Sequence, residues 1–358
     1  MMKATEGDNM RQVTINGELI SDNTDCYVIA EIGHNHQGSM ETAREMIRVA
    51  KECGVNAVKF QKRDNKSLFT SEVYNAPYNN ENSYASTYGA HREALELGKE
   101  EYRELMDYSS ELGIAMFATA FDFVSADFLA ELGVPAFKMA SGDLTNTPLL
   151  RHVAQFGKPV ILSTGGGTLD DVKRAYDAVM PVNTRLCILH CTAAYPIYDY
   201  EDMNLKVINT YREAFPDIVL GLSDHENGIS MALVAYILGA RVIEKHFTLN
   251  RAWKGTDHSF SLAPSGLRRL VRNLRRAKVA MGDGAKRRLP CEEKPLYKMS
   301  KKLVAARDLP EGRVLERDDI AIKSPGDGLP PYELDSLVGR RLIHPLKQDE
   351  NITFEVTE

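Results

Sequence analysis

From residue 27 to residue 281 the chain alternates between short apolar runs and longer amphipathic segments. The apolar runs have the length of buried strands; they are Tyr27–Glu31, Asn56–Gln61, Ala115–Ala118, Ala136–Lys138, Val160–Ser163, Leu186–His190, Val219–Leu222 and Val242–Lys245. Helical patterns lie at 41–53, 99–112, 125–132, 149–156, 169–179, 205–215, 229–238 and 265–281. Eight strand–helix repeats over about 260 residues predict an α/β fold, a (β/α)8 TIM barrel.

Glycines support this division of the chain. They stand where a helix must stop before the next strand, at Gly54, Gly113, Gly133, Gly157 and Gly239. An open doubly wound sheet would also alternate strands and helices, but the glycine fingerprint of dinucleotide sites is absent from the sequence. Before the first repeat, Val13–Ile20 alternates around Asn16-Gly17, which predicts a two-residue hairpin.

Three further segments depart from the barrel pattern. The connection Lys62–Gly98 is far longer than usual and rich in Asn, Tyr and Ser, so we expect a lid on the substrate side. Gly282–Tyr297 is charged and contains Gly and Pro, as linkers do. Lys302–Glu358 has short apolar pieces among Gly, Pro and Asp. We therefore expect a barrel domain with its hairpin over 1–281, a linker over 282–298 and a small domain over 299–358.

Two histidines follow the last two predicted strands. The functional groups of a barrel lie at the carboxyl ends of its strands, so His225 and His246 are expected to converge there. Two imidazoles beside carboxylates predict a divalent-metal site with open positions for substrate. Taken singly, each histidine would as readily satisfy a hydrogen bond in the core or in a loop. Their shared edge favours the metal site.

Two lysines stand inside apolar runs. Lys59 and Lys138 would be costly to bury without partners. The hydroxyls of Ser141 and Ser163 lie near strand ends, as does the Gly165–Gly167 loop, whose amides we expect to face inward. Together these groups predict a cradle for phosphate or carboxylate. Acidic groups for metal, hydroxyl recognition or proton transfer are available at the same ends: Glu31, Asp143, Asp224 and Asp257.

Composition, net charge and the cysteine pattern argue against nucleic-acid-binding and membrane proteins. The chain has 358 residues, a net charge of −6 and a pI near 5.9, which argues against general nucleic-acid binding. No apolar stretch approaches the roughly 18 residues that cross a bilayer, and residues 1–11 lack a signal pattern, so no membrane association is expected. The five cysteines are scattered, with no Cys-x-x-Cys pair, and predict reduced thiols in a cytoplasmic protein.

The chain resembles the sialic acid (nonulosonic acid) synthase family in a set of motifs that covers nearly its whole length. The motifs are Ala30–Gly33 with Asn35 and Gly38, Val58–Gln61, Phe137–Asp143, Leu162–Gly165, His190–Thr192 through Tyr195–Pro196, Gly221–His225 and Ile243–Phe247. The resemblance implies a TIM barrel followed by a small antifreeze-like (SAF) domain. It also implies condensation of phosphoenolpyruvate with an N-acetylmannosamine-type sugar, which gives a nine-carbon 2-keto-3-deoxy acid and phosphate.

The resemblance implies a role for each matching residue. The metal, Mn²⁺ or Mg²⁺, would be bound by His225 and His246. Phosphoenolpyruvate would be held by Lys59, Thr119, Lys138, Ser141 and Ser163. The sugar would be contacted by Glu31, Gln61, Tyr195 and Asp257, and by the small-domain segment that contains Ser324. Catalysis would involve Asp143, suited to stabilise a cationic carbon and steer a water, together with Glu31 and Lys138. Family members pair as homodimers whose small domains cap the partner's barrel, so a domain-swapped homodimer is implied.

Two departures from the family pattern leave the identity of the acceptor sugar undecided. Ala193 stands where many members have Asn, and Lys323–Gly326 has Ser324 where an Arg supplies a fork of donors. A diacetamido hexose, as for legionaminate or pseudaminate, is therefore an alternative acceptor. So is a non-acetylated aldose, as in octulosonate and heptulosonate synthases. A different class of protein, a carbohydrate- or ice-binding protein with a vestigial barrel, is the remaining alternative.

Overall fold

The computed structural model describes residues 11–358 of the chain. The chain divides into two compact units, of which the first ends at Met281 and the second spans Gly282–Glu358. Each unit has its own cluster of buried apolar side chains. Within the described residues, no helix combines the length and the apolarity that crossing a bilayer requires.

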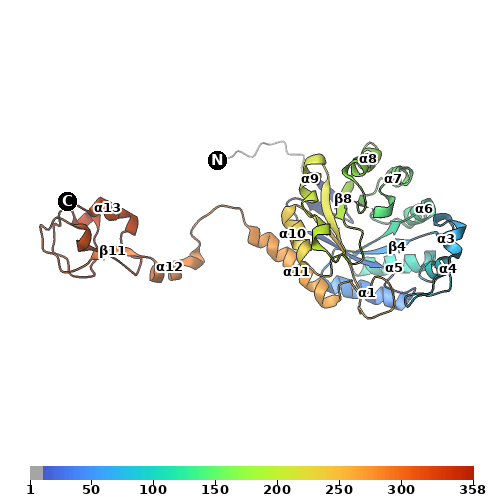
Figure 1. The fold of residues 1–358 in the computed structure, drawn as a ribbon, viewed down its shortest axis with the longest axis horizontal. Helices are drawn as coiled ribbons and strands as arrows, with labels where there is room; N and C mark the ends of the chain where they lie inside the picture. Colours follow the sequence, from blue (N-terminus) through green and yellow to red (C-terminus); the bar gives the residue numbers. More distant parts are fainter. Residues whose placement is uncertain (1–10) are drawn as a thin grey trace. The chain divides into compact units, whose positions relative to one another are not determined.

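Eight parallel strands close a barrel in the first unit (Figure 1). In their order around the barrel they are β10 (Val242–His246), β3 (Tyr27–Gly33), β4 (Ala57–Lys62), β5 (Ala115–Ala120), β6 (Phe137–Met139), β7 (Val160–Ser163), β8 (Leu186–Cys191) and β9 (Val219–Asp224). All their residues are buried except Gln61 and Lys62 at the end of β4. Strands covered on both faces read as continuous apolar runs, and the predicted TIM barrel is confirmed.

Helices surround the barrel (Figure 1). They are α1 (Met40–Cys53), α5 (Lys99–Glu111), α6 (Phe123–Leu132), α7 (Thr147–Gln155), α8 (Leu169–Val179), α9 (Val207–Ala214), α10 (Ser230–Leu238) and α11 (Pro264–Met281). Helix α1 illustrates how the sequence sets their ends. The Ser39 side chain accepts the N–H of Thr42 at its start, and Gly54 ends it with a φ of 85°.

A hairpin precedes the barrel, as predicted. Strands β1 (Gln12–Ile15) and β2 (Glu18–Ser21) pair antiparallel. Asn16 and Gly17 have φ angles of 50° and 80°, the left-handed pair that a tight hairpin turn requires. Ile15 and Ile20 on the hairpin are buried in the same apolar cluster as the barrel.

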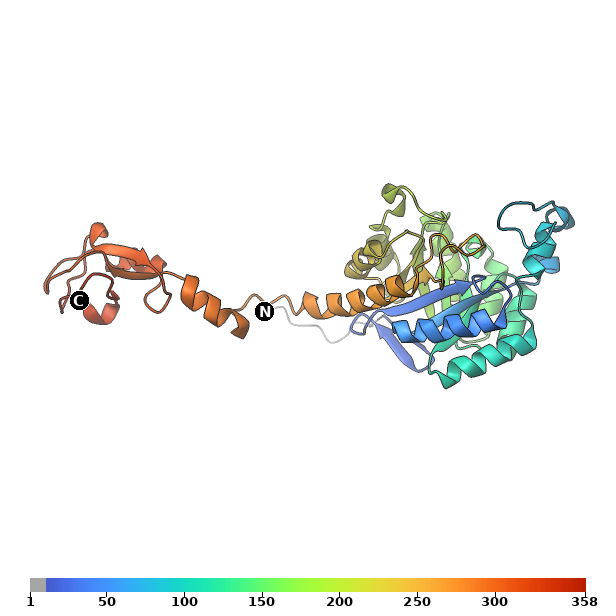
Figure 2. The ribbon, with the colours of Figure 1, turned by 90° about the horizontal axis from the view of Figure 1, so that it is seen from below.

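The long connection after β4 contains more regular structure than its sequence pattern predicts. It forms three short helices, α2 (Asn65–Leu68), α3 (Ser71–Asn75) and α4 (Tyr88–Glu93), which lie at one end of the barrel (Figure 2). Each begins at a side-chain cap, which compensates for the missing apolar period. The tyrosines largely pack inside the segment: the Tyr78 ring lies 4.5 Å from His91 and 5.3 Å from Tyr88.

The second unit is small and loop-rich. Its regular elements are α12 (Glu293–Met299), β11 (Lys302–Ala305), β12 (Ile320–Lys323) and α13 (Leu334–Leu337). Helix α12 begins inside the segment predicted as a linker, so this segment contains regular structure, and its bounds as a linker remain a prediction. The carboxylate of Glu292 accepts the N–H of Leu289 at 2.7 Å and starts the turn that leads into the helix. No residue of α12 is buried, and the helix therefore adds nothing to either apolar cluster.

A buried aspartate organises the loops of the second unit. The side chain of Asp319 is fully buried and accepts hydrogen bonds from Arg307 at 2.6 Å and from Arg313 at 2.9 Å. It also accepts the backbone N–H of Glu316 at 3.0 Å. Burial alone would raise the pKa of Asp319, but these three donors outweigh it and lower the pKa.

We predict that Asp319→Asn destabilises the second unit by about 2 kcal/mol, because it removes charge-assisted bonds from two guanidinium groups. Amide hydrogen exchange of β11 and β12 measures this directly. The pKa is lower in the folded state, so this stabilisation is present above the unfolded value of about 3.9 and is lost as pH falls through the folded value. Asp318→Asn, on the exposed neighbour, is the control. Equal protection of the two variants at neutral pH would contradict the prediction.

Candidate active site

A cavity of about 460 Å³ lies at the carboxyl ends of the barrel strands. This is within the size range of small-molecule sites. Its lining includes eleven residues that the sequence predicts for the site: Glu31, Lys59, Gln61, Thr119, Lys138, Ser141, Ser163, Tyr195, His225, His246 and Asp257. The barrel therefore gathers residues from all eight strands or the loops that follow them.

Lys59 is paired with carboxylates inside the barrel. Its Nζ lies 2.7 Å from Glu31 Oε2 and 3.7 Å from Glu244 Oε1, and it donates to Thr119 Oγ1 at 2.8 Å. Burial raises the pKa of Glu31 to about 7, although Lys59 opposes the shift. Glu244 is a site residue that the sequence interpretation missed. Its position could have predicted it, since it lies two residues before His246 and therefore on the same face of β10.

Lys138 lies on the other side of Glu244. Its Nζ donates to Ser163 Oγ at 2.6 Å and to the Met139 carbonyl at 2.9 Å, with Glu244 Oε1 at 4.0 Å. Burial lowers the pKa of Lys138, and Glu244 opposes that shift. Burial would raise the pKa of Glu244, but Lys138 and Lys59 outweigh it and lower the pKa. The two lysines are thus balanced by two glutamates.

The glycine loop supports the site indirectly. Gly165 donates its N–H to Ser141 Oγ at 2.9 Å, and a Cβ on Gly165 would lie 2.8 Å from the Cβ of Ala193. Only glycine fits so close an approach. The Gly167 N–H is bonded to Thr164 O, and Gly165–Gly167 does not line the cavity. The expectation that these amides face the ligand is therefore wrong for Gly165 and Gly167, and the cradle is made of side chains.

The two histidines face each other, with ring centroids 5.3 Å apart. His225 Nδ1 lies 2.9 Å from the Thr192 carbonyl, which can only accept, so Nδ1 carries the proton and Nε2 keeps its lone pair. Burial, aided by His246, lowers the pKa of His225 to about 4. Burial likewise lowers the pKa of His246. Both imidazoles are therefore neutral near pH 7, the form that binds metal ions.

The donor set fits a divalent cation. His246 Nδ1 is buried without a hydrogen bond and lies 3.6 Å from Asp257 Oδ2. The bond from His225 to Thr192 is the kind of outer contact that orients a metal-binding imidazole. Among residues 11–358 no group of three or more His, Cys, Asp or Glu side chains is arranged to hold a metal. A cation at the two histidines would take its other ligands from water or substrate.

The residues on either side of His225 are held by a buried ion pair that lies outside the barrel interior. Lys245 Nζ lies 2.7 Å from Asp224 Oδ2 and also donates to the Glu226 carbonyl. Asp224 Oδ1 accepts the Glu226 N–H at 2.8 Å. The carboxylate of Asp224 is thus occupied behind the strand, and Asp224 is absent from the cavity lining, contrary to expectation. It fixes the backbone on both sides of His225 instead.

Two other predicted site residues are not brought to the cavity lining. Asp143 is buried on the turn Ser141–Asp143, where it accepts a hydrogen bond from Asn146 at 3.0 Å, and burial raises its pKa. Ser324 belongs to the second unit and accepts a hydrogen bond from Lys301 at 2.6 Å. The catalytic role of Asp143 and the sugar contact of Ser324 remain predictions.

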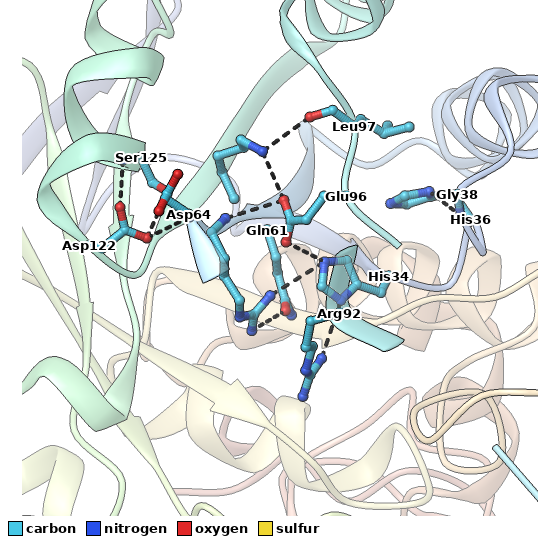
Figure 3. A network of polar contacts seen from close by, with 12 residues as sticks. His34, His36, Gly38, Gln61, Asp64, Arg92, Glu96, Leu97, Asp122 and Ser125 are labelled. Carbon is cyan, nitrogen blue, oxygen red and sulfur yellow. Dashed lines mark hydrogen bonds and ion pairs between the residues drawn. The ribbon is translucent and has the colours of Figure 1, made fainter. Parts of the chain in front are cut away.

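The lid contributes one of its tyrosines, as expected of a substrate-side lid, and two residues that the sequence interpretation did not name for the site. Tyr84, His91 and Arg92 line the cavity, together with Arg63 at the end of β4 and His34 after β3. Figure 3 shows His34 between Glu96 and Arg92. The lid is also joined to the loop that carries Asp257. Tyr84 donates its hydroxyl to Lys254 O at 2.8 Å, and Asn82 accepts the Gly255 N–H at 2.9 Å.

Comparison with known proteins agrees with this geometry. The NeuB family profile matches residues 46–286, and the SAF domain profile matches residues 302–355. The chain belongs to the NeuB family. The predicted resemblance to sialic acid synthases and the predicted TIM barrel with a C-terminal SAF domain are thereby confirmed.

Several relatives span nearly the whole chain. The human N-acetylneuraminate-9-phosphate synthase is 41% identical over 96% of this chain and 95% of its own length. The N,N'-diacetyllegionaminic acid synthase of Legionella pneumophila is 37% identical over 93% and 95%. Among solved structures, the N-acetylneuraminic acid synthetase of Leptospira borgpetersenii superposes with a TM-score of 0.70 at 31% identity, covering 80% of this chain and 95% of that one. This NeuB family chain is therefore a phosphoenolpyruvate-dependent condensing enzyme.

We predict that His225→Ala and His246→Ala each weaken Mn²⁺ binding by more than about 100-fold, the upper end of what losing an outer contact alone costs. Titration of the free Mn²⁺ signal by electron paramagnetic resonance measures this without an activity assay. His152→Ala, which removes an imidazole from helix α7, is the control. Unchanged Mn²⁺ affinity in both variants would disprove the assignment of these ligands.

Proposed function

We propose that the protein condenses phosphoenolpyruvate with an N-acylated amino sugar of the N-acetylmannosamine type, and releases phosphate. The observation that carries this proposal is the convergence of two neutral histidines and two buried lysines on one cavity. The histidines suit a Lewis-acid cation beside the aldehyde, and the lysines suit an anionic enol phosphate. Such a set of buried ionic groups also favours an enzyme over a vestigial barrel, since each is costly to keep without use.

Phosphoenolpyruvate would bind at the lysines. Lys59 and Lys138 offer ammonium donors, and the hydroxyls of Thr119, Ser141 and Ser163 surround them. Arrival of the anion replaces glutamate contacts with phosphate and carboxylate contacts. With a pKa near 7, Glu31 is suited to hold a proton when its lysine turns to the substrate.

The sugar would bind nearer the mouth. Gln61 donates to Glu31 Oε1 at 2.6 Å, so the two side chains present a fixed pair of polar groups to its hydroxyls. Tyr195, whose ring lies 4.1 Å from that of His225, and Asp257 complete this side. A divalent cation, Mn²⁺ or Mg²⁺, held by His225 and His246 would polarise the sugar aldehyde.

The bond changes follow from the two substrates. The enol carbon of phosphoenolpyruvate attacks C1 of the sugar, so a C–C bond forms and the aldehyde oxygen takes up a proton. The neighbouring carbon becomes cationic and accepts water, which loses a proton. The tetrahedral adduct then breaks its C–O bond to phosphate and leaves a 2-keto-3-deoxy acid. We keep Asp143 as the proposed stabiliser of that cation and Glu31 as the proton carrier.

Assembly and location are further parts of the proposal. We propose a homodimer with exchanged SAF domains, in which the segment around Ser324 reaches the partner's sugar. Support comes from the 16 residues Gly282–Tyr297, which would extend for tens of ångströms where they are not helical. We also propose a cytoplasmic location, supported by five cysteines that are all free thiols.

We predict that Lys138→Met raises the KM for phosphoenolpyruvate by about 10- to 100-fold and leaves the sugar KM within about threefold, because a charged donor to an anion is lost. Phosphate release across a panel of N-acetylmannosamine, mannose and a diacetamido hexose measures both values and tests the proposed reaction. Lys158→Met, on an exposed residue below β7, is the control. A rise in the sugar KM alone would show that the cradle is misplaced.

Domain exchange has its own test. A chain truncated after Gly284 retains the barrel, and a full-length Lys138→Met chain retains the small domain. Each should have little activity by itself at a phosphoenolpyruvate concentration near the wild-type KM, whereas a mixture should regain activity there, because the intact small domain covers the sound barrel of its partner. Phosphate release in the mixture, with heterodimers verified by native mass spectrometry, measures this. An inactive mixture that contains heterodimers would mean that each small domain serves its own barrel.

A further inference from the structure

The backbone pairing between β9 and β10 stops just before the two histidines. Among the described residues, Asp224 and Lys245 are the last partners in the register of these two strands. His246 still belongs to β10 and is paired with Glu31 on the other side of that strand. His225, in contrast, lies beyond the end of β9. The strand ladder therefore places His246 but does not reach His225.

A side-chain bridge continues where the ladder stops. Lys245 Nζ lies 2.7 Å from Asp224 Oδ2 and donates a second hydrogen bond to the carbonyl of Glu226. Asp224 Oδ1 accepts the N–H of Glu226 at 2.8 Å. Glu226 is the residue directly after His225. The bridge thus spans His225 and holds the next residue to β10, the strand that carries His246.

The other polar contacts of His225 lead in the opposite direction, toward β8. Its Nδ1 lies 2.9 Å from the Thr192 carbonyl and 3.9 Å from Cys191 Sγ. Its own carbonyl accepts the N–H of Ile197 at 3.2 Å. All three partners belong to the end of β8 or to the loop after it. The bridge from Lys245 is therefore the contact that ties this stretch of chain to the side of the second histidine.

The ion pair acts from outside the cavity. Ser223, His225 and Glu244 line the cavity, whereas Asp224 and Lys245 do not. Successive residues of a strand point to opposite faces, so the side chains of the pair lie behind the strands. Both residues are 1% exposed. Their effect on a ligand in the cavity must therefore pass through the positions of their neighbours.

Stability alone does not explain an ion pair in this place. Removing two charges from water costs about as much as their attraction returns, and an apolar pair of similar volume is often equally stable. The preceding partners on the same face of the two strands, Leu222 and Ile243, are such a buried apolar pair. The best-attested use of a buried polar contact is to fix one register among several.

We propose that the ion pair of Asp224 with Lys245 is a positioning pair, which sets His225 at the distance from His246 that one divalent cation requires. This inference rests on the proposed cation site. The two rings have centroids 5.3 Å apart. Bonds from a cation to its ligands tolerate only about 0.2 Å of variation. A small shift of His225 toward β8 therefore weakens binding although both imidazoles are present.

A double variant separates positioning from stability. Asp224→Leu with Lys245→Met removes both charges and keeps the branching and length of the two side chains. Single variants are unsuitable, because each leaves an unpaired charge in the interior. We expect an unchanged or raised thermal transition and about 10-fold weaker Mn²⁺ binding, the lower end of what loss of an outer contact costs. Electron paramagnetic resonance of free Mn²⁺ measures the affinity without an activity assay.

The matched control is Ile243→Val, which shortens a buried side chain on the same face of β10. It should lower the thermal transition and leave Mn²⁺ affinity within about twofold, because it loosens packing without touching the bridge. Wild-type Mn²⁺ affinity in the double variant, or an equal loss in Ile243→Val, would overturn the positioning role.

Other outcomes separate the positioning role from the cation site itself. A double variant that does not fold would assign the ion pair to stability and would also overturn the inference. Each of these results leaves the proposed condensation standing, provided that His225→Ala abolishes tight Mn²⁺ binding. If His225→Ala binds Mn²⁺ as the wild type does, the proposed cation site fails and this inference fails with it.

Discussion

The interaction on which the rest of the structure depends is the pairing of two buried lysines with two buried glutamates inside the barrel. Lysines in such a place are tolerated only with partners. Glu244 contacts both Lys59 and Lys138, and it lies on the last strand, which is far from either lysine in the sequence. Only closure of the barrel, with β10 beside β3, brings it there. The fold and the chemistry therefore require each other.

The positively charged side chains of the cavity fall into two kinds, which differ in whether carboxylates pair with them. At the lysines, glutamates balance the charge, so an anion bound there would exchange one set of contacts for another. At Arg63 and Arg92, the partners are an amide, a phenol and a neutral imidazole, so the positive charge remains available. Lysines whose charge is already balanced by carboxylates suit a substrate that is consumed at each turnover. Arginines whose charge is not balanced suit recognition of a group that does not react.

Sequence reasoning works best where one physical rule decides the outcome. Strands that are buried on both faces read as apolar runs, and all eight were found, most of them ending one or two residues early. Glu244 and Arg63 were missed although the two-residue period placed them beside named site residues. Arg92 gave no such signal, since it lies in an insertion whose path only the structure supplies. The catalytic role given to Asp143 came from a motif, which fixes neighbours along the chain but not the direction of a side chain.

The division between barrel and insertion explains how one architecture serves several acceptors. The groups proposed to hold the enol phosphate and the aldehyde come from strand ends, whose spacing the closed barrel fixes. Arg92 comes from the lid, which is attached to the loop of Asp257 through Tyr84 and Asn82. Substitutions in the lid leave the barrel register untouched, because its side chains pack largely on one another. Differences between acceptors can therefore reside in the lid while the strand ends retain the condensation.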